Sequence, residues 1–476
     1  MATVLPTQHD FAAQAFERVM RLRRLIASVA LFILLELSLV GLAPYADTVA
    51  SATSQQGDIG RQVLILGALG LLMIAPSNAR PPMAVPTSIL ILLGYCLLTC
   101  LWAIEPALAM RRLALTTAAI WIVVRSVGDL GAVRTLNLMR IVLVVLLVAN
   151  FVSIYATPLA KHLATDESSI IDDWRGVMSH KNVAGVACSM TILFFAFDRT
   201  SSRMPPWVHA LVLSAATVFL VMSNAKTSIG MVVIALAAGF AMQFYNPRHR
   251  SMALPAGVTA AGLIVLYVFM YSGIIERILN DPFALTGRGS IWPPLLEYAG
   301  DHLLTGSGFG SFWQIGDRSP IFDYARGWVA HNIGSGHNGY LDLLVTIGLP
   351  GLVLAVAVLL VWPMIRLLCS LSISRPRRAL LCSILVFCAG SNITESTLLD
   401  RTAVVEIFLV IAVVLIHRLS DQSAGAHQYL RERMIRLATR NSFKAIRSRI
   451  ATGDWSRPGA VRDAAGTPEP AEDRIG

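Results

Sequence analysis

The run Thr286-Gly287-Arg288-Gly289-Ser290 has the residue types of an anion-binding site. A guanidinium such as that of Arg288 pairs with a diphosphate through two parallel charge-assisted hydrogen bonds. Helical spacing predicts a helix after the run, with Ser290 as N-cap, two prolines in the first turn and an end at Gly306. Its apolar face comprises Ile291, Trp292, Leu295, Leu296, Ala299 and Leu303. Arg288 would lie beside the helix N-terminus, whose free N–H groups attract anions.

A glycine-rich run, Gly306-Ser307-Gly308-Phe309-Gly310, follows this predicted helix. Successive backbone N–H groups in such turns can converge on one anion, an arrangement called a nest. The run therefore predicts a second group of anion donors.

His337 could accept a proton. It opens the run His337-Asn338-Gly339-Tyr340-Leu341, and a neutral imidazole can take the proton of an attacking sugar hydroxyl. A lone histidine at a membrane surface can also simply contact lipid headgroups. His331 is an alternative base, and Glu395 is another unless it only pairs with Arg401.

Cations and amides in other short polar segments could contact the same substrate. Trp174-Arg175-Gly176 precedes His180-Lys181-Asn182, and a hairpin, Ser223-Asn224-Ala225-Lys226, holds one lysine. Each cation taken singly could equally bind a lipid headgroup. The candidate substrate-binding residues are Arg175, His180, Lys181, Asn182, Lys226, Arg326, Asn338 and Glu395.

Composition indicates that lipid surrounds much of the chain. Hydrophobic residues make up 55% of the 476 residues and charged residues 14%, whereas soluble proteins carry about 25% charged residues. The net charge of +10 falls in short loops and the C-terminal tail, which is typical of membrane proteins rather than nucleic-acid binders. The six cysteines lie in or beside apolar runs without a CxxC, so we interpret them as packing residues.

Apolar runs long enough to span a bilayer predict an all-α polytopic membrane protein with about twelve transmembrane helices. The runs centre near Ala30–Leu42, Val63–Ala75, Ser88–Ala103, Ala114–Val124, Ile141–Tyr155, Val183–Phe197, Trp207–Met222, Ile229–Phe244, Leu254–Tyr271, Tyr340–Trp362, Ala379–Ala389 and Ala403–Ile416. Spans 1–9 fall within 25–274 and spans 10–12 within 339–417. The first run follows a polar stretch and has spanning length, so the N-terminus does not resemble a cleavable signal.

Lysine and arginine in the loops predict that both ends of the chain are cytoplasmic. On this topology 1–24 is a cytoplasmic segment, 275–338 is a large periplasmic loop between spans 9 and 10, and 418–476 is a cytoplasmic tail. Long loops are more often functional than idle. Arg111 and Arg112 fall on the outer side, against the general trend. In the tail, Tyr429–Ile450 predicts a basic amphipathic helix on the anionic leaflet, and the residues after Gly453 have a disordered composition.

No HExxH, GxSxG or P-loop motif occurs in the sequence. Asp47 and Asp58 are far apart, and Asp172-Asp173 is adjacent rather than spaced as DxD. We therefore predict a reaction that needs no metal, no nucleotide and no other cofactor.

The long loop and its flanks resemble the O-antigen ligase/Wzy polymerase superfamily. The matching stretches are Thr286-Gly287-Arg288 with Ile291-Trp292, Gly306–Gly310, and His337–Leu341 followed by Gly348 and Gly351. The stretch Trp174–Asn182 is similar to the ExoQ-type exopolysaccharide polymerase branch. The resemblance covers Trp174 to Gly351.

The resemblance implies a multi-pass bacterial inner-membrane enzyme whose active site faces the periplasm. Such an enzyme transfers glycan from an undecaprenyl diphosphate carrier to a sugar hydroxyl. By motif, Arg288 would hold the donor diphosphate, His337 would be the base, and Arg175 and Lys181 would be further contacts. Arg326 carries over less securely, because no clear motif surrounds it. A flippase and a chain-length regulator would be partners beside the lipid-linked substrate and membrane lipids.

Three alternatives remain open at the level of the sequence. A ligase would pass the glycan to lipid A core, whereas a polymerase passes it to another lipid-linked repeat unit, which the His180–Asn182 region favours. A lipid-linked oligosaccharide flippase or other transporter would place polar groups at mid-membrane, often on repeated halves, and neither feature occurs. A scaffold without chemistry would not need cations in a glycine-rich and aromatic loop.

Overall fold

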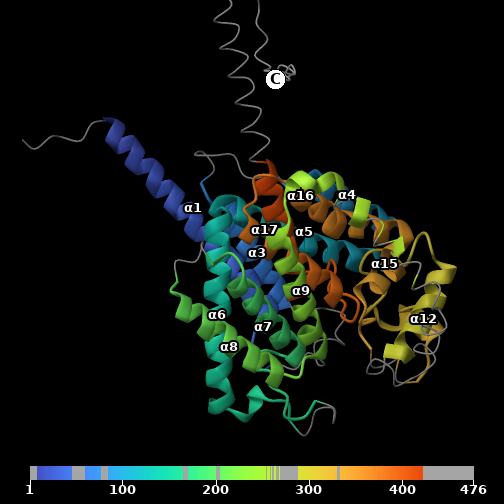
Figure 1. Ribbon diagram of the computed structural model, residues 1–476. Coiled ribbons are helices and arrows are strands. Elements are labelled where there is room, and N and C mark those ends of the chain that lie inside the picture. The colour runs from blue at the N-terminus through green and yellow to red at the C-terminus, as the bar shows by residue number, and fades with distance from the viewer. Residues whose placement is uncertain are drawn as a thin grey trace, which may run out of the picture. The chain divides into compact units, whose positions relative to one another are not determined.

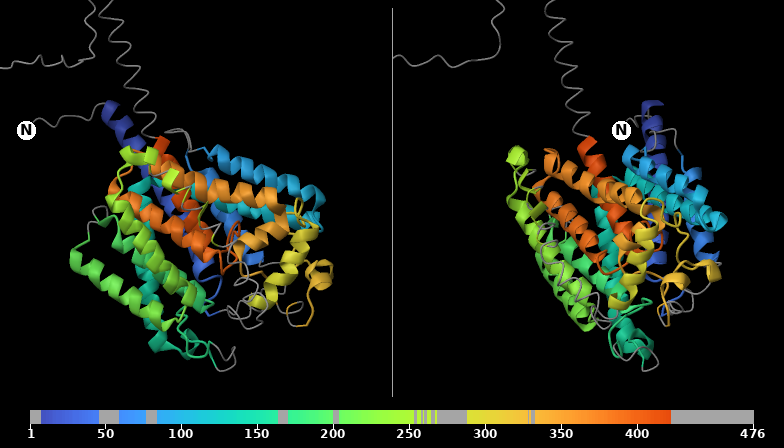
Figure 2. Two further views of the ribbon diagram at one scale, coloured as in Figure 1. Left: turned by 45° about the vertical axis from the view of Figure 1, so that its right-hand side comes forward. Right: turned by 90° about the vertical axis from the view of Figure 1, so that its right-hand side faces the viewer.

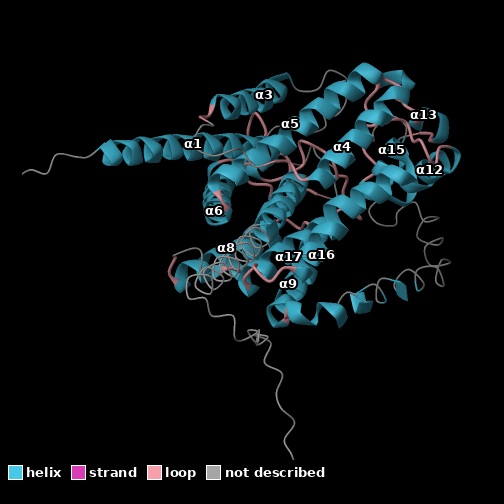
Figure 3. Ribbon diagram, turned by 90° about the horizontal axis from the view of Figure 1, so that it is seen from above, coloured by secondary structure: helices cyan, strands magenta, loops and turns pink. Residues whose placement is uncertain are grey.

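The computed structural model describes residues 8–45, 59–76, 84–163, 170–199, 204–252, 255–257, 259, 262–263, 267, 288–327, 329 and 333–421. These residues belong to the compact unit Met1–Asp421. The second unit, Gln422–Gly476, lies outside the described residues, and so does the predicted tail helix. Within the described ranges the fold is helical, without strands and with one isolated β-bridge between Lys161 and Trp174 (Figure 3).

The helices confirm the all-α fold class. They are α1 (Gln8–Leu39), α3 (Ile59–Ile74), α4 (Thr87–Thr99), η1 (Cys100–Trp102), α5 (Pro106–Leu130), α6 (Ala132–Ala156), η2 (Pro158–Ala160), α7 (Lys181–Ala196), α8 (Pro206–Met222), α9 (Lys226–Phe244), η4 (Pro247–His249), α12 (Arg288–Asp301), η5 (Gly316–Arg318), α13 (Ile321–Tyr324), α15 (Gly339–Val356), η6 (Ala357–Val361), α16 (Trp362–Cys369) and α17 (Arg375–Ser391). Residues 404–421 form a last helix. Every predicted apolar run overlaps helical residues; most of the run Leu254–Tyr271 lies outside the described residues, and those of its residues that are described are helical.

The chain is an integral membrane protein. Of the described helices, four are long and apolar enough to cross a bilayer: Pro106–Leu130, Ala132–Ala156, Lys226–Phe244 and Gly339–Cys369. Several shorter apolar helices accompany them. Exposed apolar side chains, such as Val63 and Leu66 on α3 and Leu211 on α8, suit contact with lipid.

The core of the helical bundle is built around α17 and the helix at 404–421, whose apolar residues are nearly all buried. Helix α17 packs against α9 and α7, α7 packs against α8, and α1 packs against α3 and α5 (Figures 1 and 2). A helix buried all round is apolar on every face, which is why the period of its sequence carries little directional information.

Arginines from three of the predicted cytoplasmic segments meet at the end of α5. Asp129 at the end of α5 pairs with Arg23 of α1 at 2.6 Å and with Arg125 at 3.1 Å. Arg418 donates to the carbonyl of Val127 at 2.8 Å and to that of Gly128. Segments assigned to one side of the membrane from their charges therefore meet in the structure.

Helix α15 is interrupted at Gly348, where φ is 68°. The preceding loop fills the interruption: the Ser307 N–H donates to the Val345 carbonyl at 2.9 Å, and the Leu349 N–H donates to the Leu303 carbonyl at 2.7 Å. A Cβ at Gly348 would lie 2.4 Å from the Leu304 carbonyl oxygen. This position therefore requires glycine for both its conformation and its space.

The prediction for α12 was wrong at both ends. The helix includes Arg288 and ends at Asp301, so Ser290 lies inside it rather than capping it, and Gly306 lies beyond its end. The chain leaves the helix early because the residues before Ser307 must reach the interruption in α15. On the predicted apolar face Ile291 and Leu295 are buried, but Leu296 is 45% exposed.

Candidate functional site

Three distant segments meet at the Glu395 carboxylate. Its Oε1 accepts a hydrogen bond from Asn182 Nδ2 at 3.0 Å and pairs with Arg288 Nη2 at 3.3 Å. Arg288 also donates to the Thr394 carbonyl at 2.6 Å. The prediction that Glu395 might only pair with Arg401 was therefore wrong. The pairing joins the first residue of α12 to the first turn of α7.

Asn392 explains why the chain turns so as to present Glu395. This residue directly follows α17. Its side-chain oxygen accepts hydrogen bonds from the Thr397 N–H at 3.0 Å, the Thr397 hydroxyl at 2.8 Å and the Leu398 N–H at 3.1 Å. The Gly339 N–H donates to the carbonyls of Asn392 at 2.8 Å and Glu395 at 3.0 Å. These bonds tie the turn that carries Glu395 to the start of α15.

His337 lies on a backbone that is fixed on both sides. The Gly336 N–H before it donates to Asp342 Oδ1 at 3.0 Å. Asn338 after it caps α15, accepting from the N–H groups of Tyr340 and Leu341 at 3.1 Å. His337 itself has a φ of 49°, an uncommon conformation for a residue other than glycine. The side chain of Asn338 is thus used in a cap, which was not foreseen.

The imidazole of His337 is held neutral. Burial, followed by the nearby charge of Arg288, lowers its pKa to about 4. Both effects disfavour the protonated ring. A neutral imidazole close to a guanidinium combines a proton acceptor with an anion-binding cation.

A second histidine caps α7 and is also held neutral. His180 Nδ1 accepts the Asn182 N–H at 3.2 Å, and His162 Nε2 accepts the Lys181 N–H at 3.3 Å. Burial lowers the pKa of His180 to about 4, with smaller contributions from His162, Lys181 and His337. An accepting ring nitrogen cannot be protonated without losing its bond, so the cap requires the neutral form.

The cations of the 174–182 stretch are already engaged. Lys181 pairs with Asp173 at 2.6 Å. Arg175 is 3% exposed and donates to the carbonyls of Leu159 at 2.9 Å and Ser179 at 3.2 Å. This placement favours a role for Arg175 in holding the loop rather than in direct substrate contact.

The remaining predicted residues lie apart from this cluster or outside the described residues. Arg326 is exposed after α13, and Lys226 is exposed at the first residue of α9. Its neighbour Thr227 does reach the cluster, with its hydroxyl 2.9 Å from that of Thr394. His331 lies outside the described residues.

The predicted nest at Gly306–Gly310 was wrong. Three of its N–H groups are used within the protein: Gly306 donates to the His302 carbonyl at 2.9 Å, Ser307 to α15, and Phe309 to Thr99 Oγ1 at 3.1 Å. The glycines instead permit close packing, since a Cβ at Gly308 would lie 2.4 Å from Ala103 Cα.

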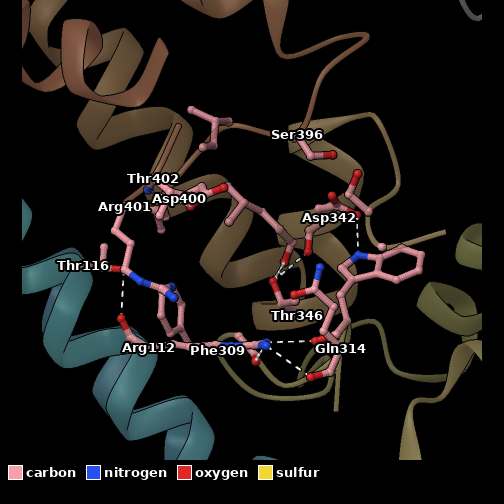
Figure 4. A pocket seen from close by; sticks show the side chains of 18 of the residues that line it. Arg112, Thr116, Phe309, Gln314, Asp342, Thr346, Ser396, Asp400, Arg401 and Thr402 are labelled. Atoms are coloured by element: carbon pink, nitrogen blue, oxygen red, sulfur yellow. Dashed lines mark hydrogen bonds between the residues drawn. The ribbon is translucent and has the colours of Figure 1, made fainter. Parts of the chain in front are cut away.

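A cavity of ≈ 390 Å³ borders the loop that carries His337. Its walls include Gly334, Ser335, Gly339 and Asp342, together with Ser396 from the turn that carries Glu395. Four arginines line it as well: Arg61, Arg111, Arg112 and Arg401. In Figure 4, Arg112 and Arg401 lie toward one side and Asp342 toward the other. Sequence reasoning missed this cavity, although Arg111 and Arg112 had stood out as outer-side cations.

Residues 209–356, about a third of the chain, match the family model described as O-antigen ligase. The matched segment contains Arg288 and His337, together with both halves of the interruption in α15. Trp174–Asn182, which carries the ExoQ-type resemblance, lies outside it. No curated protein matches the chain.

Proposed function

From the O-antigen ligase match over residues 209–356, which supports the O-antigen ligase/Wzy polymerase superfamily, we propose that this chain polymerises undecaprenyl diphosphate-linked oligosaccharide repeats. It is a glycosyltransferase that works without metal or nucleotide at the periplasmic face of the inner membrane. The observation that carries the proposal is the neutral His337 beside the Arg288–Glu395 pair.

The reaction requires one proton acceptor and one anion-binding group. The acceptor hydroxyl oxygen attacks the anomeric carbon of the donor sugar, and the bond from that carbon to the diphosphate oxygen breaks. Undecaprenyl diphosphate leaves with the electron pair, and the hydroxyl proton passes to His337. A base whose pKa lies below the working pH is fully available for this step.

Arg288 binds the donor diphosphate and stabilises the charge that develops on it as the bond breaks. Its partners include the Thr394 carbonyl and Glu395, so the diphosphate shares or displaces these bonds. Burial raises the pKa of Glu395, and the adjacent Arg288 opposes this shift. Glu395 positions Arg288 and Asn182 and is not itself the base.

The 174–182 stretch supports a polymerase over a ligase. Its resemblance is to exopolysaccharide polymerases, and its Asn182 contacts the same carboxylate as Arg288. A flippase that delivers the repeats and a chain-length regulator would be functional partners.

Reconstitution tests the proposal. Full-length protein in liposomes receives a lipid-diphosphate-linked oligosaccharide with EDTA and no nucleotide, and product length is read on a gel. A ladder of repeat multiples that is lost in Arg288→Ala supports the polymerase. A single transfer to added lipid A core would instead identify a ligase, and labelled donor crossing the bilayer unchanged would identify a transporter.

A further inference from the structure

The cavity with four arginines is not used by the proposed reaction. It lies beside the His337 loop, but His337, Arg288 and Glu395 are not among its lining residues. Its volume of ≈ 390 Å³ falls within the usual range of small-ligand sites. The cavity thus has the space and the position to hold part of a glycan whose reacting end is at His337.

The lining is positively charged. Among the described lining residues, the acidic side chains are Asp342 and Asp400, and the basic ones are Arg61, Arg111, Arg112 and Arg401. Asp342 accepts from Trp313 Nε1 at 2.9 Å and from the Gly336 N–H, and Asp400 accepts from the N–H of Thr402 at 2.9 Å and its hydroxyl at 2.8 Å. Both carboxylates therefore accept hydrogen bonds from loop groups, and two carboxylates stand against four guanidinium groups.

The hydrogen-bond partners of the Arg112 side chain are backbone carbonyls. It donates to the carbonyls of Gly310 at 2.5 Å, Trp313 at 2.9 Å and Gln314 at 3.2 Å. Carbonyls orient a guanidinium but do not neutralise it. Arg112 thus fixes the loop after Gly310 as one wall of the cavity and contributes a net positive charge to it.

Arg401 is the cation available to a ligand. Among the described residues its side chain makes no hydrogen bond or ion pair, and it is only partly exposed. Burial lowers its pKa; the nearby charge of Asp400 opposes this shift, and those of Arg111 and Arg61 reinforce it. A partly buried guanidinium facing like charges gains from an added anion.

We propose that this cavity binds an anionic group, a carboxylate or a phosphate, carried by a sugar of the glycan substrate, with Arg401 as its principal contact. The inference rests on the proposed function, since it takes the ligand to be the glycan that reacts at His337. The enzyme would accordingly prefer acidic repeat units over neutral ones.

Binding to full-length protein in phosphatidylcholine nanodiscs tests this inference. The acidic probe is hyaluronan tetrasaccharide, which carries glucuronate carboxylates, and the neutral probe is chitotetraose; both are titrated by calorimetry. We expect the acidic probe to bind roughly tenfold or more weakly to Arg401→Gln, and the neutral probe to be unaffected. Arg401→Lys retains most of the binding. Arg318→Gln is the control with the same change in charge, because Arg318 pairs with Glu105 and does not line the cavity. This variant should bind the acidic probe as well as wild type does.

Two results would overturn the inference. One is that wild type and a folded Arg401→Gln variant bind the acidic probe equally well, or that neither of them binds it. The other is loss of the acidic probe when phosphatidylglycerol is added to the nanodiscs, which would make the cavity a lipid headgroup site.

A parallel titration with inorganic pyrophosphate separates this inference from the proposed function. The proposed function expects Arg288→Gln to weaken pyrophosphate binding and Arg401→Gln to leave it unchanged. No effect of Arg288→Gln would count against the donor site while leaving the result for the acidic saccharide intact. A loss in Arg401→Gln instead would make the cavity the diphosphate site and overturn the inference.

Discussion

Arg288 and Glu395, which are 107 residues apart in the chain, form an ion pair at 3.3 Å whose carboxylate also holds Asn182. The pair connects the start of α12, the start of α7 and the turn after α17. Removing one member of a partly buried pair leaves the other charge without its partner. The geometry of the proposed donor site therefore depends on three segments at once.

Glu395→Gln should lower kcat with a smaller change in KM. The amide keeps a hydrogen-bond acceptor for Asn182 but loses the charge that orients Arg288. A loss of roughly tenfold is expected, since hydrogen bonds to charged groups contribute about 1.5–3 kcal/mol. Steady-state kinetics on the reconstituted enzyme measure it, with Glu297→Gln on α12 as a control. Unchanged kinetics would show that Glu395 does not position Arg288.

Activity should fall on the acid side as His337 becomes protonated. Because its pKa is about 4, the base is active above that pH and is lost below it. The profile of kcat/KM against pH should therefore be level near neutrality and decline toward pH 4. His337→Ala should reduce the rate by roughly 10²-fold or more and remove this limb. An acid limb that persists in His337→Ala would assign it to another group.

Stability should depend on pH through the His180 cap. The folded pKa of about 4 lies below the unfolded value of about 6.5, so the unfolded chain binds more protons between these values. The contribution to stability is thus complete above about pH 6.5 and is lost as pH falls toward 4. His180→Asn, which caps a helix without titrating, should reduce the pH dependence of thermal unfolding in this window. An unchanged slope would contradict the assignment.

Gly348→Ala should destabilise the fold. The new Cβ would lie 2.4 Å from the Leu304 carbonyl oxygen at a φ of +68°, and a positive φ alone costs about 1–2 kcal/mol for an L-residue. A marked fall in unfolding temperature is expected. Gly94→Ala in α4 is the matched control, because its Cβ meets nothing within 4 Å and alanine favours a helix. Equal unfolding temperatures for the two variants would exclude strain at Gly348.

The helices were predictable from the sequence because lipid requires apolar runs of fixed length, and Val63–Ala75 and Ala379–Ala389 proved helical like the rest. The start of α12 and the conformation of the run Gly306–Gly310 could not be predicted from the sequence. Local sequence patterns predicted that Ser290 caps the helix and that Gly306–Gly310 binds an anion. In the structure, the packing of this loop against α15 determines where α12 ends and how the glycine-rich run is used. The partner of Glu395 could not be predicted either, because no local rule selects Arg288 over Arg401, which is much closer to Glu395 in the sequence.

The arginine cavity shows a different limit. Arg111 and Arg112 were visible as cations on the unexpected side of the membrane, but Arg61 and Arg401 come from other parts of the chain. The number of cations in a loop can indicate the side of the membrane on which the loop lies. Only the tertiary structure shows that α3, α5 and the turn before the helix at 404–421 bring these arginines to one cavity.

The interruption of α15 also bears on how the chain enters the membrane. Unpaired backbone groups are costly in hydrocarbon. Around Gly348, the Val345 carbonyl accepts from Ser307, the Leu349 N–H donates to Leu303, and Tyr95 donates to the Ile347 carbonyl at 3.2 Å. All three partners precede α15 in the chain and so leave the ribosome before it. The span can therefore meet its hydrogen-bonding partners as it is inserted, without first existing as a continuous helix that must later break.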